Sequence, residues 1–202
     1  MRFVLEGPGA PRHDAGNPIF MSNAFPKTVE NLNAAFQGES NASHRYAIFA
    51  KTADAEGHPY TARLFRAASR AEAIHRDSHK AAILALGGVV KEFTLGEVIP
   101  GTTAENLKVA IAGEVHERDV MYPEFLAIAK EEAAREAIRT MTFALKVETQ
   151  HACLYQAALD NLGHNADLPL YVCPICGETL TELPAKSCPV CGAAAEKFEK
   201  IA

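Results

Sequence analysis

The chain contains four long stretches with apolar residues at helical spacing, and acidic residues interrupt the apolar face of each one. In the first stretch, Leu32, Tyr46 and Phe49 mark the apolar face, and Glu39 falls on the same line. Residues three, four and seven apart share one face of an α-helix, so these acids are predicted to point into the core of a bundle. The polar residues on the four apolar faces are, in order, Glu39; Glu72 and His75; Glu114 and Glu117; Glu148 and His151.

Five buried carboxylates need compensating charge. Moving one bare carboxylate into a dry interior has an idealised cost of order 20 kcal/mol, of which several kcal/mol remain after relaxation. A domain with a net stability of about 5–15 kcal/mol would unfold with five of them. Multivalent cations are the simplest compensation. Two of the stretches contain Glu-x-x-His, and this combination with acids from the other two is the known ligand pattern of ferritin-like di-iron proteins.

Glycine and proline set the bounds of the predicted helices, which span residues 28–56, 59–86, 103–132 and from there to about 162. Residues 89–102 are long for a bundle loop and suit a crossover that returns the chain to the far end of the bundle. We therefore predict a mainly α fold, with a ferritin-like four-helix bundle over residues 28–164 and a long crossover between its second and third helices.

The acids are predicted to meet at one level of this bundle. Glu39 lies 18 residues before Gly57 and Glu72 lies 15 residues after it, so the two are about 27 and 22 Å from the turn at 1.5 Å per residue. With a turn near residue 132, Glu117 and Glu148 are 15 and 16 residues from it. The spacing predicts a single site shared by all four helices.

Residues 1–27 show no periodicity and contain four prolines and three glycines. We interpret them as an extended or disordered N-terminal arm. Met21 is an alternative start of the protein, and the sequence leaves both starts open. Thr28 is the expected N-cap of the first helix.

Residues 168–202 form a separate segment with two Cys-Pro-x-Cys-Gly knuckles. Each knuckle brings two sulfurs together, and two knuckles make a tetrahedral S4 site for iron or zinc. A segment this short cannot bury enough core to fold alone, so the metal must hold it together. Cys153, outside the knuckles, is interpreted as a buried small hydrophobe. The four predicted ligands are Cys173, Cys176, Cys188 and Cys191.

Composition narrows the classes of function. Hydrophobic residues make up 48% of the chain, which supports a packed core, and the net charge of −5 argues against electrostatic binding of nucleic acid. No apolar run approaches the ~20 residues of a membrane span. Paired cysteines at metal-ligand spacing indicate a reducing compartment, so we expect a cytoplasmic protein without membrane or nucleic-acid partners.

Taken together, these motifs resemble the rubrerythrin family over roughly residues 28–202. The resemblance is carried by the run AFQGES at 35–40, the two Glu-x-x-His pairs, GExxE at 113–117 followed by MYPxF at 121–125, and the rubredoxin-like knuckles. It implies that Glu72 and Glu148 bridge two irons, and that Glu114 and His151 are terminal ligands of one of them. Glu39 would be terminal on the other iron, where His75 and Glu117 would alternate with oxidation state. Tyr46 and Tyr122 match family tyrosines that hydrogen-bond carboxylate ligands.

The resemblance also implies a function. The family reduces hydrogen peroxide to water, in defence against oxidative stress. Its electrons come from reduced pyridine nucleotide (NADH) through a separate reductase or rubredoxin, and pass through the S4 iron to the di-iron site. In the family the S4 iron usually serves the di-iron site of a partner subunit. A head-to-tail homodimer is therefore expected, and exchange of helices across residues 89–102 is a further hypothesis.

Several alternatives stay open at this point. A ferritin-like ferroxidase or iron store would use the same bundle, although Glu117 and the cysteine segment count against it. An electron-transfer or redox-sensing protein without turnover is a third class. A zinc ribbon would have the same cysteine spacing as the S4 iron site. His79, one turn beyond His75, is either a ligand or, as we favour, a residue behind the ligands or at the edge of the core.

Overall fold

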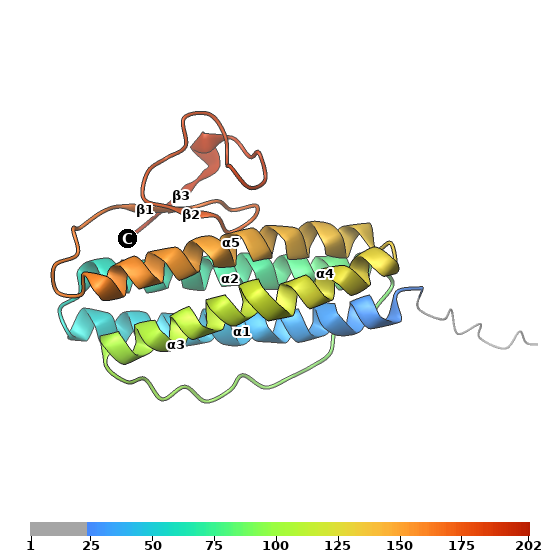
Figure 1. Ribbon diagram of the computed structural model, residues 1–202, viewed down its shortest axis with the longest axis horizontal. Coiled ribbons are helices and arrows are strands. Elements are labelled where there is room, and N and C mark those ends of the chain that lie inside the picture. The colour runs from blue at the N-terminus through green and yellow to red at the C-terminus, as the bar shows by residue number, and fades with distance from the viewer. Residues whose placement is uncertain (1–23) are drawn as a thin grey trace, which may run out of the picture.

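The computed structural model describes residues 24–202, so most of the arm predicted for residues 1–27 lies outside the described residues (Figure 1). These residues form five α-helices, one π-helical segment, one short 3-10 helix and a small three-stranded sheet. They are α1 (Pro26–Ala55), α2 (Pro59–Ala85), α3 (Thr103–His116), η1 (Glu117–Met121), α4 (Tyr122–Glu131), α5 (Arg135–Asp160), β1 (Leu170–Val172), β2 (Thr179–Leu180), η2 (Ala195–Lys197) and β3 (Glu199–Ile201).

The helices form the predicted ferritin-like bundle. Helix α1 packs along α2, and α3 packs along α5, with α4 continuing the line of α3. The segment between α2 and α3 runs without regular structure along the bundle, on the face opposite the C-terminal sheet (Figure 1). It is fixed there by side chains of α1, because the amide of Gly96 donates to Asn41 Oδ1 (2.8 Å) and that of Lys91 to Asn33 Oδ1 (2.7 Å). The predicted crossover is therefore confirmed.

The start of α1 differs from the prediction. The helix begins at Pro26 rather than after Thr28, and the Thr28 hydroxyl is buried without a hydrogen-bond partner. Proline suits the first helical position because its φ is preset and its missing N–H has no partner there. The free amides of Lys27 and Thr28 donate instead to the carboxylate of Glu132 (3.2 and 2.9 Å). A distant side chain thus replaces the predicted local cap.

The predicted third helix is not one continuous α-helix. Residues Glu117–Met121 form a π-helical segment between α3 and α4. Pro123 explains the position, because proline has no N–H for the carbonyl four residues earlier and its ring presses against the preceding turn. A π-turn widens the helix by one residue at that point. The start of α3 is regular, with Thr102 and Glu105 forming a reciprocal capping box.

The bundle core consists of two apolar clusters separated by the layer of acids and histidines. One cluster gathers around Tyr46, Phe65 and Tyr155, and the other around Leu32 and Met141. Helices α1, α2 and α5 contribute to both clusters, whereas α3 contributes only to the first and α4 only to the second. The apolar clusters therefore hold the four helices in register on either side of the polar layer.

The C-terminal segment is a small sheet with two cysteine loops. The strand order is β2–β1–β3, and both pairings are antiparallel.

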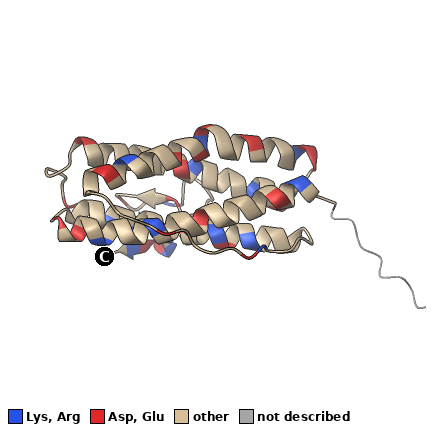
Figure 2. Ribbon diagram, turned by 90° about the horizontal axis from the view of Figure 1, so that it is seen from below, with Lys and Arg blue, Asp and Glu red and all other residues tan. Residues whose placement is uncertain are grey.

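Lys and Arg are interspersed with Asp and Glu along the helices (Figure 2). Among residues 24–202, no helix is long and apolar enough to cross a membrane.

Candidate metal centres

Six of the seven predicted ligands of the bundle converge in its centre, at 0–2% exposure. They fall into two groups of four residues, within each of which one potential ligand atom per residue lies within 4.8 Å of the others. Glu72 and Glu148 belong to both groups, so the groups describe two adjacent cation positions with two shared carboxylates. The first group adds Glu39 and His75; the second adds Glu114 and His151.

Several buried nitrogen and oxygen atoms of this cluster have no hydrogen bond and are suitable ligands for cations. The described residues include few buried polar atoms without a hydrogen bond, and half of them lie here: Glu39 Oε2, Glu72 Oε1, Glu114 Oε2, both oxygens of Glu148 and His151 Nδ1. Buried polar atoms are normally paired, so this concentration in one place indicates a missing partner. Carboxylate and imidazole in this combination are the donors that iron accepts in di-iron bundles.

Without cations the cluster must hold protons. Burial raises the pKa of Glu114 to about 8, helped by the charge of Glu72, and raises that of Glu39 well above its usual range. Burial opposes ionisation of Glu72 too, but the neighbouring imidazoles of His151 and His75 outweigh it and lower the pKa of that carboxyl. Cations entering the cluster would therefore displace protons.

Two tyrosines hold outer carboxylates of the cluster. The hydroxyl of Tyr46 donates to Glu114 Oε1 (2.6 Å), and that of Tyr122 donates to Glu39 Oε1. Both rings are almost fully buried. Each tyrosine thus occupies one oxygen of a carboxylate and leaves the other free to bind a cation, in agreement with the expected contact.

Glu117 and His79 lie outside the two groups. Glu117 begins the π-helical segment and lines a pocket of about 890 Å³ beneath the crossover. His79 is fully buried one turn beyond His75, and its Nε2 lies 2.9 Å from the Tyr122 hydroxyl. The structure therefore places His79 behind the ligands, as favoured from the sequence, and places His75 rather than Glu117 in the cluster.

The four predicted cysteines form a second, separate centre. Cys173 Sγ lies 3.6 Å from Cys191 Sγ, and Cys176 Sγ lies 3.5 Å from Cys188 Sγ. A tetrahedral site with metal–sulfur bonds of about 2.3 Å has sulfur–sulfur edges of about 3.8 Å, whereas a disulfide bond is about 2.05 Å long. The spacing therefore fits a metal and excludes disulfides. Cys153 is exposed, contrary to the burial expected for it.

The two knuckles have the same backbone construction. The amide of Gly177 donates to the Cys173 carbonyl (2.9 Å), and the amide of Gly192 donates to the Cys188 carbonyl (3.0 Å). Both glycines have positive φ, 81° and 77°, which other residues adopt only with strain. A hydrogen bond from the Cys176 thiol and backbone amides nearby lower the pKa of Cys173 to about 5, which favours the thiolate that binds metal.

One knuckle lies directly on the bundle cluster of its own chain. His75 Nε2 is 2.9 Å from the backbone carbonyl of Cys176, and His151 Nε2 is 3.1 Å from the Thr179 hydroxyl. The carbonyl can only accept, and the hydroxyl already donates to Gly177 O (3.1 Å). Both Nε2 atoms must therefore carry hydrogen, which leaves each Nδ1 facing the carboxylates as the ligand atom.

The resemblance implied that the S4 iron serves a partner subunit, whereas this contact is formed within a single chain. Three arginines along one face of α2 hold the C-terminal domain there. Arg70 makes two hydrogen bonds to Glu199 (2.8 and 2.9 Å), Arg66 binds the Ala202 carbonyl (2.7 Å), and Arg63 binds Asp167 (2.6 Å). The dimer expected from the resemblance stays a prediction.

Sequence reasoning missed the residues that join the two centres. The Cys176 carbonyl is a backbone group and has no signal in the sequence. Thr179 follows the first knuckle and is fully buried, and Glu178 beside it is buried with a pKa raised to about 7 by desolvation. Their proximity to His151 depends on how the two domains dock, which no local pattern reports.

The fold and the two centres define a ferritin-like dinuclear carboxylate protein with a C-terminal four-cysteine domain. The sequence profile of rubrerythrin matches residues 30–159, and that of the rubrerythrin rubredoxin-like domain matches residues 171–199. The chain belongs to the rubrerythrin family. Its cofactors are accordingly a pair of irons in the bundle and one metal in the four-cysteine site.

Individual relatives agree with this assignment over nearly the whole chain. Rubrerythrin-2 of Clostridium acetobutylicum is 36% identical over 189 residues, which is 89% of this chain and 99% of the relative. Nigerythrin of Nitratidesulfovibrio vulgaris is 35% identical over 76% of each chain. The solved structure of nigerythrin in its mixed-valent state has a TM-score of 0.79 at 29% identity, and covers 95% of this chain and 100% of that one.

Proposed function

We propose that this oxidoreductase is a peroxide reductase that converts hydrogen peroxide to two molecules of water with two electrons and two protons. The electrons come from NADH through a separate reductase or rubredoxin and enter at the four-cysteine domain. The expected setting is defence against oxidative stress in the cytoplasm.

The observation that supports this proposal best is the hydrogen bond from His75 to the Cys176 carbonyl, 2.9 Å long. Cys176 is a predicted ligand of one centre and His75 of the other, so only one hydrogen bond separates their ligand shells. An iron-storage protein does not need a direct contact between two metal centres. A protein that transfers electrons from one centre to a dinuclear site does need one.

Ligand roles follow the two groups of four. Glu72 and Glu148, which both groups share, are proposed to bridge the irons. Glu114 and His151 hold one iron, and Glu39 holds the other. When bound, the iron pair supplies both electrons for cleavage of the O–O bond, and the S4 iron supplies electrons one at a time.

His75 and Glu117 are proposed to alternate on the Glu39 side. Neutral His75 suits the ferrous state, and the carboxylate of Glu117 suits the more highly charged ferric state. Desolvation and the charges of Glu114 and Glu148 raise the pKa of Glu117. Glu117 lines the pocket beneath the crossover, so a small neutral molecule such as peroxide would meet this carboxyl from the solvent side.

Stopped-flow visible spectroscopy tests the proposal. The iron-loaded chain is reduced without oxygen and mixed with peroxide in one run and with oxygen in another. We expect the ferric S4 colour to return fast with peroxide and slowly with oxygen. A faster reaction with oxygen would favour the ferroxidase alternative. A chain without any S4 colour would contain zinc in the four-cysteine site, and electron delivery through that domain would be wrong.

A further inference from the structure

A line of hydrogen bonds continues outward from the cluster behind Glu39. The Tyr122 hydroxyl, which donates to Glu39, lies 2.9 Å from Nε2 of His79. On the other side of the same imidazole, Nδ1 lies 3.2 Å from the hydroxyl of Thr140 on α5. Four side chains from four different helices are thus joined in one series.

The hydrogen bonds in this series all have the same direction. The hydrogen of Tyr122 is used on Glu39, so Tyr122 can only accept from His79, and Nε2 must carry the hydrogen. A neutral imidazole has one N–H, so Nδ1 is bare and accepts from the Thr140 hydroxyl. His79 is fully buried, and burial disfavours the charged imidazolium. Every donor in the series therefore points toward Glu39.

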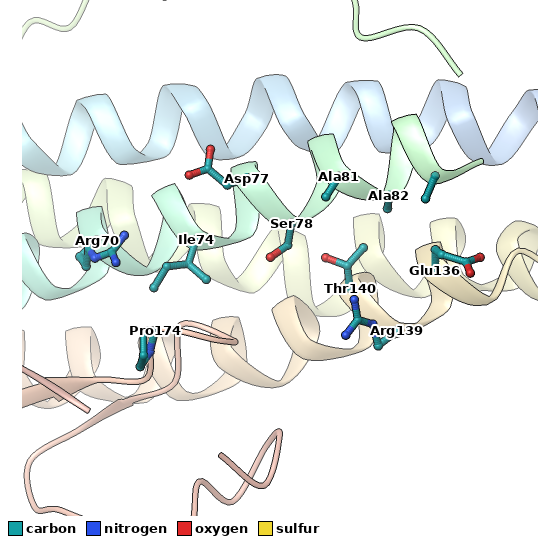
Figure 3. Close-up of a pocket in the computed structure, with 11 residues that line it drawn as sticks. Arg70, Ile74, Asp77, Ser78, Ala81, Ala82, Glu136, Arg139, Thr140 and Pro174 are labelled. Carbon is teal, nitrogen blue, oxygen red and sulfur yellow. The ribbon is translucent and has the colours of Figure 1, made fainter. Parts of the chain in front are cut away.

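The outer end of the series reaches a surface pocket. Thr140 lines an open pocket of about 460 Å³ between α2 and α5, near the first cysteine knuckle at Pro174 (Figure 3). Ser78 and Ala82 line it from the α2 side, and Glu136 and Arg139 from the α5 side. A pocket of this size holds water, so Thr140 lies beside a source of protons.

The second tyrosine of the site has no such continuation. Tyr46 donates to Glu114 in the same way, but its ring packs against Phe49, Phe65 and Tyr155, with centroid distances of 5.5–6.3 Å. Within the described residues, no hydrogen bond leads from the Tyr46 hydroxyl to the surface. The polar series behind Tyr122 is therefore a feature of one side of the site and not a general consequence of burying a tyrosine there.

We propose that Thr140, His79 and Tyr122 form a proton relay from the pocket between α2 and α5 to Glu39, serving the peroxide reduction proposed above. In one passage, an acid in the pocket protonates Thr140 Oγ1, Thr140 passes its own hydrogen to His79 Nδ1, Nε2 passes its hydrogen to Tyr122, and Tyr122 passes its hydrogen to Glu39 Oε1. Each intermediate member begins and ends neutral. The net result is one proton moved from the pocket to Glu39, which leaves hydrogen on Nδ1 of His79 and none on Nε2.

The relay is tested with Thr140→Val, which keeps the shape of the side chain and removes the hydroxyl. Thr140→Ser is the rescue variant. Thr61→Val is the matched control, because Thr61 is also buried, on α2, and its hydroxyl has no hydrogen-bond partner. The first readout does not depend on activity: nitrogen NMR of the His79 ring in the zinc-loaded, diamagnetic chain. We expect hydrogen on Nε2 in the wild type, and a changed Nδ1 shift in Thr140→Val but not in Thr61→Val. Hydrogen on Nδ1 in the wild type would overturn the relay.

The second readout is the solvent deuterium isotope effect on the oxidation of the reduced, iron-loaded chain by peroxide. General acid catalysis contributes on the order of 10²-fold or more. We expect a loss of that order, with a changed isotope effect, in Thr140→Val, restoration by Thr140→Ser and no change in Thr61→Val. A wild type that does not react with peroxide would refute the proposed function itself. A wild type that reacts, with Thr140→Val unchanged in rate and isotope effect, would refute the relay alone.

Discussion

Gly177 and Gly192 occupy the same position in the two cysteine knuckles, but only Gly177 has a neighbour. A Cβ added at Gly177 would lie 2.7 Å from His75 Nε2 and 3.2 Å from Ala71 Cβ, whereas one added at Gly192 would meet nothing within 4 Å. Both have nearly the same positive φ. Substitutions at these two glycines therefore distinguish the effect of the positive φ within a knuckle from the effect of the contact between a knuckle and the bundle.

The Gly177→Ala and Gly192→Ala variants are expected to differ in electron transfer. Both introduce strain at positive φ, of about 1–2 kcal/mol. Only Gly177→Ala also pushes the knuckle away from His75, so the reduced S4 centre should be reoxidised by peroxide several-fold more slowly. The measurement is stopped-flow absorbance of the S4 iron in both variants. Equal slowing in both would show that strain within the knuckle, and not its docking, controls the rate.

The shared carboxylates predict the iron content of two variants. Glu148 belongs to both groups of ligands, whereas Glu114 belongs to one. Glu148→Ala is therefore expected to lose both bundle irons, and Glu114→Ala to lose one, with the metal of the four-cysteine site retained in both. Metal analysis by mass spectrometry gives the stoichiometry per chain. Two bundle irons in Glu148→Ala would contradict its assignment as a bridge.

Glu117 is expected to affect turnover and not iron binding, because it lies outside both groups. We expect Glu117→Ala to keep its iron and lose most of its peroxide turnover. Glu97→Ala is the control, because Glu97 is an exposed acid that lines the same pocket. The measurement combines steady-state peroxide consumption with metal analysis. Unchanged turnover in Glu117→Ala would remove Glu117 from the proposed mechanism.

The metal-free chain should become less stable as pH rises from 4.5 to about 8. The pKa of Glu114 is about 8 in the folded state against an ordinary value of 4.5. In that window the unfolded chain has released a proton that the folded chain still holds, so rising pH favours unfolding. The raised pKa of Glu39 acts in the same direction, as do those of His75 and His151, whose stabilising charges are lost as pH rises through them. Three lowered pKa values act oppositely: that of Glu72 only below 4.5, that of His79 (about 3) up to 6.5, and that of Cys173 (about 5) from 5 to 9. The raised values outnumber them in the window, because the pKa values of Glu117 and Glu178 are raised as well.

Urea unfolding followed by circular dichroism, at several values of pH across that window, measures the effect. The iron-loaded chain is the control. Its stability should rise with pH over the same range, because protons compete with the metal for the ligands. A metal-free chain whose free energy of unfolding increases with pH would contradict the protonated cluster.

The features that could be predicted from the sequence are those that follow from a regular helical period. Glu39 and Glu148 lie on regular apolar stripes, so both their burial and their common level could be calculated from helix geometry. The break at Glu117 could not, because a π-turn changes the count by one residue without interrupting the apolar pattern. The start of α1 was misplaced for a similar reason: the acceptor for its first amides is Glu132, more than a hundred residues away.

Contacts between residues far apart in the chain could not be predicted from the sequence either. Thr140 and Cys176 acquire their roles only through neighbours that are distant in the chain, at separations of 61 and 101 residues. Thr140 contributes a hydroxyl and Cys176 contributes a backbone carbonyl. Both groups are too common in proteins to mark a site in the sequence. His79 did stand out, and its place behind the ligands was predicted, but its two partners were not.

Under the proposed electron path, the contact between Cys176 and His75 would also set the kinetic order of electron delivery. Because both centres belong to one polypeptide, the second centre meets the first at a local concentration fixed by the connecting chain, on the order of millimolar for a short tether. Passage of an electron between them is then a unimolecular event. Dilution of the protein slows its encounter with the external donor and leaves this internal step unchanged.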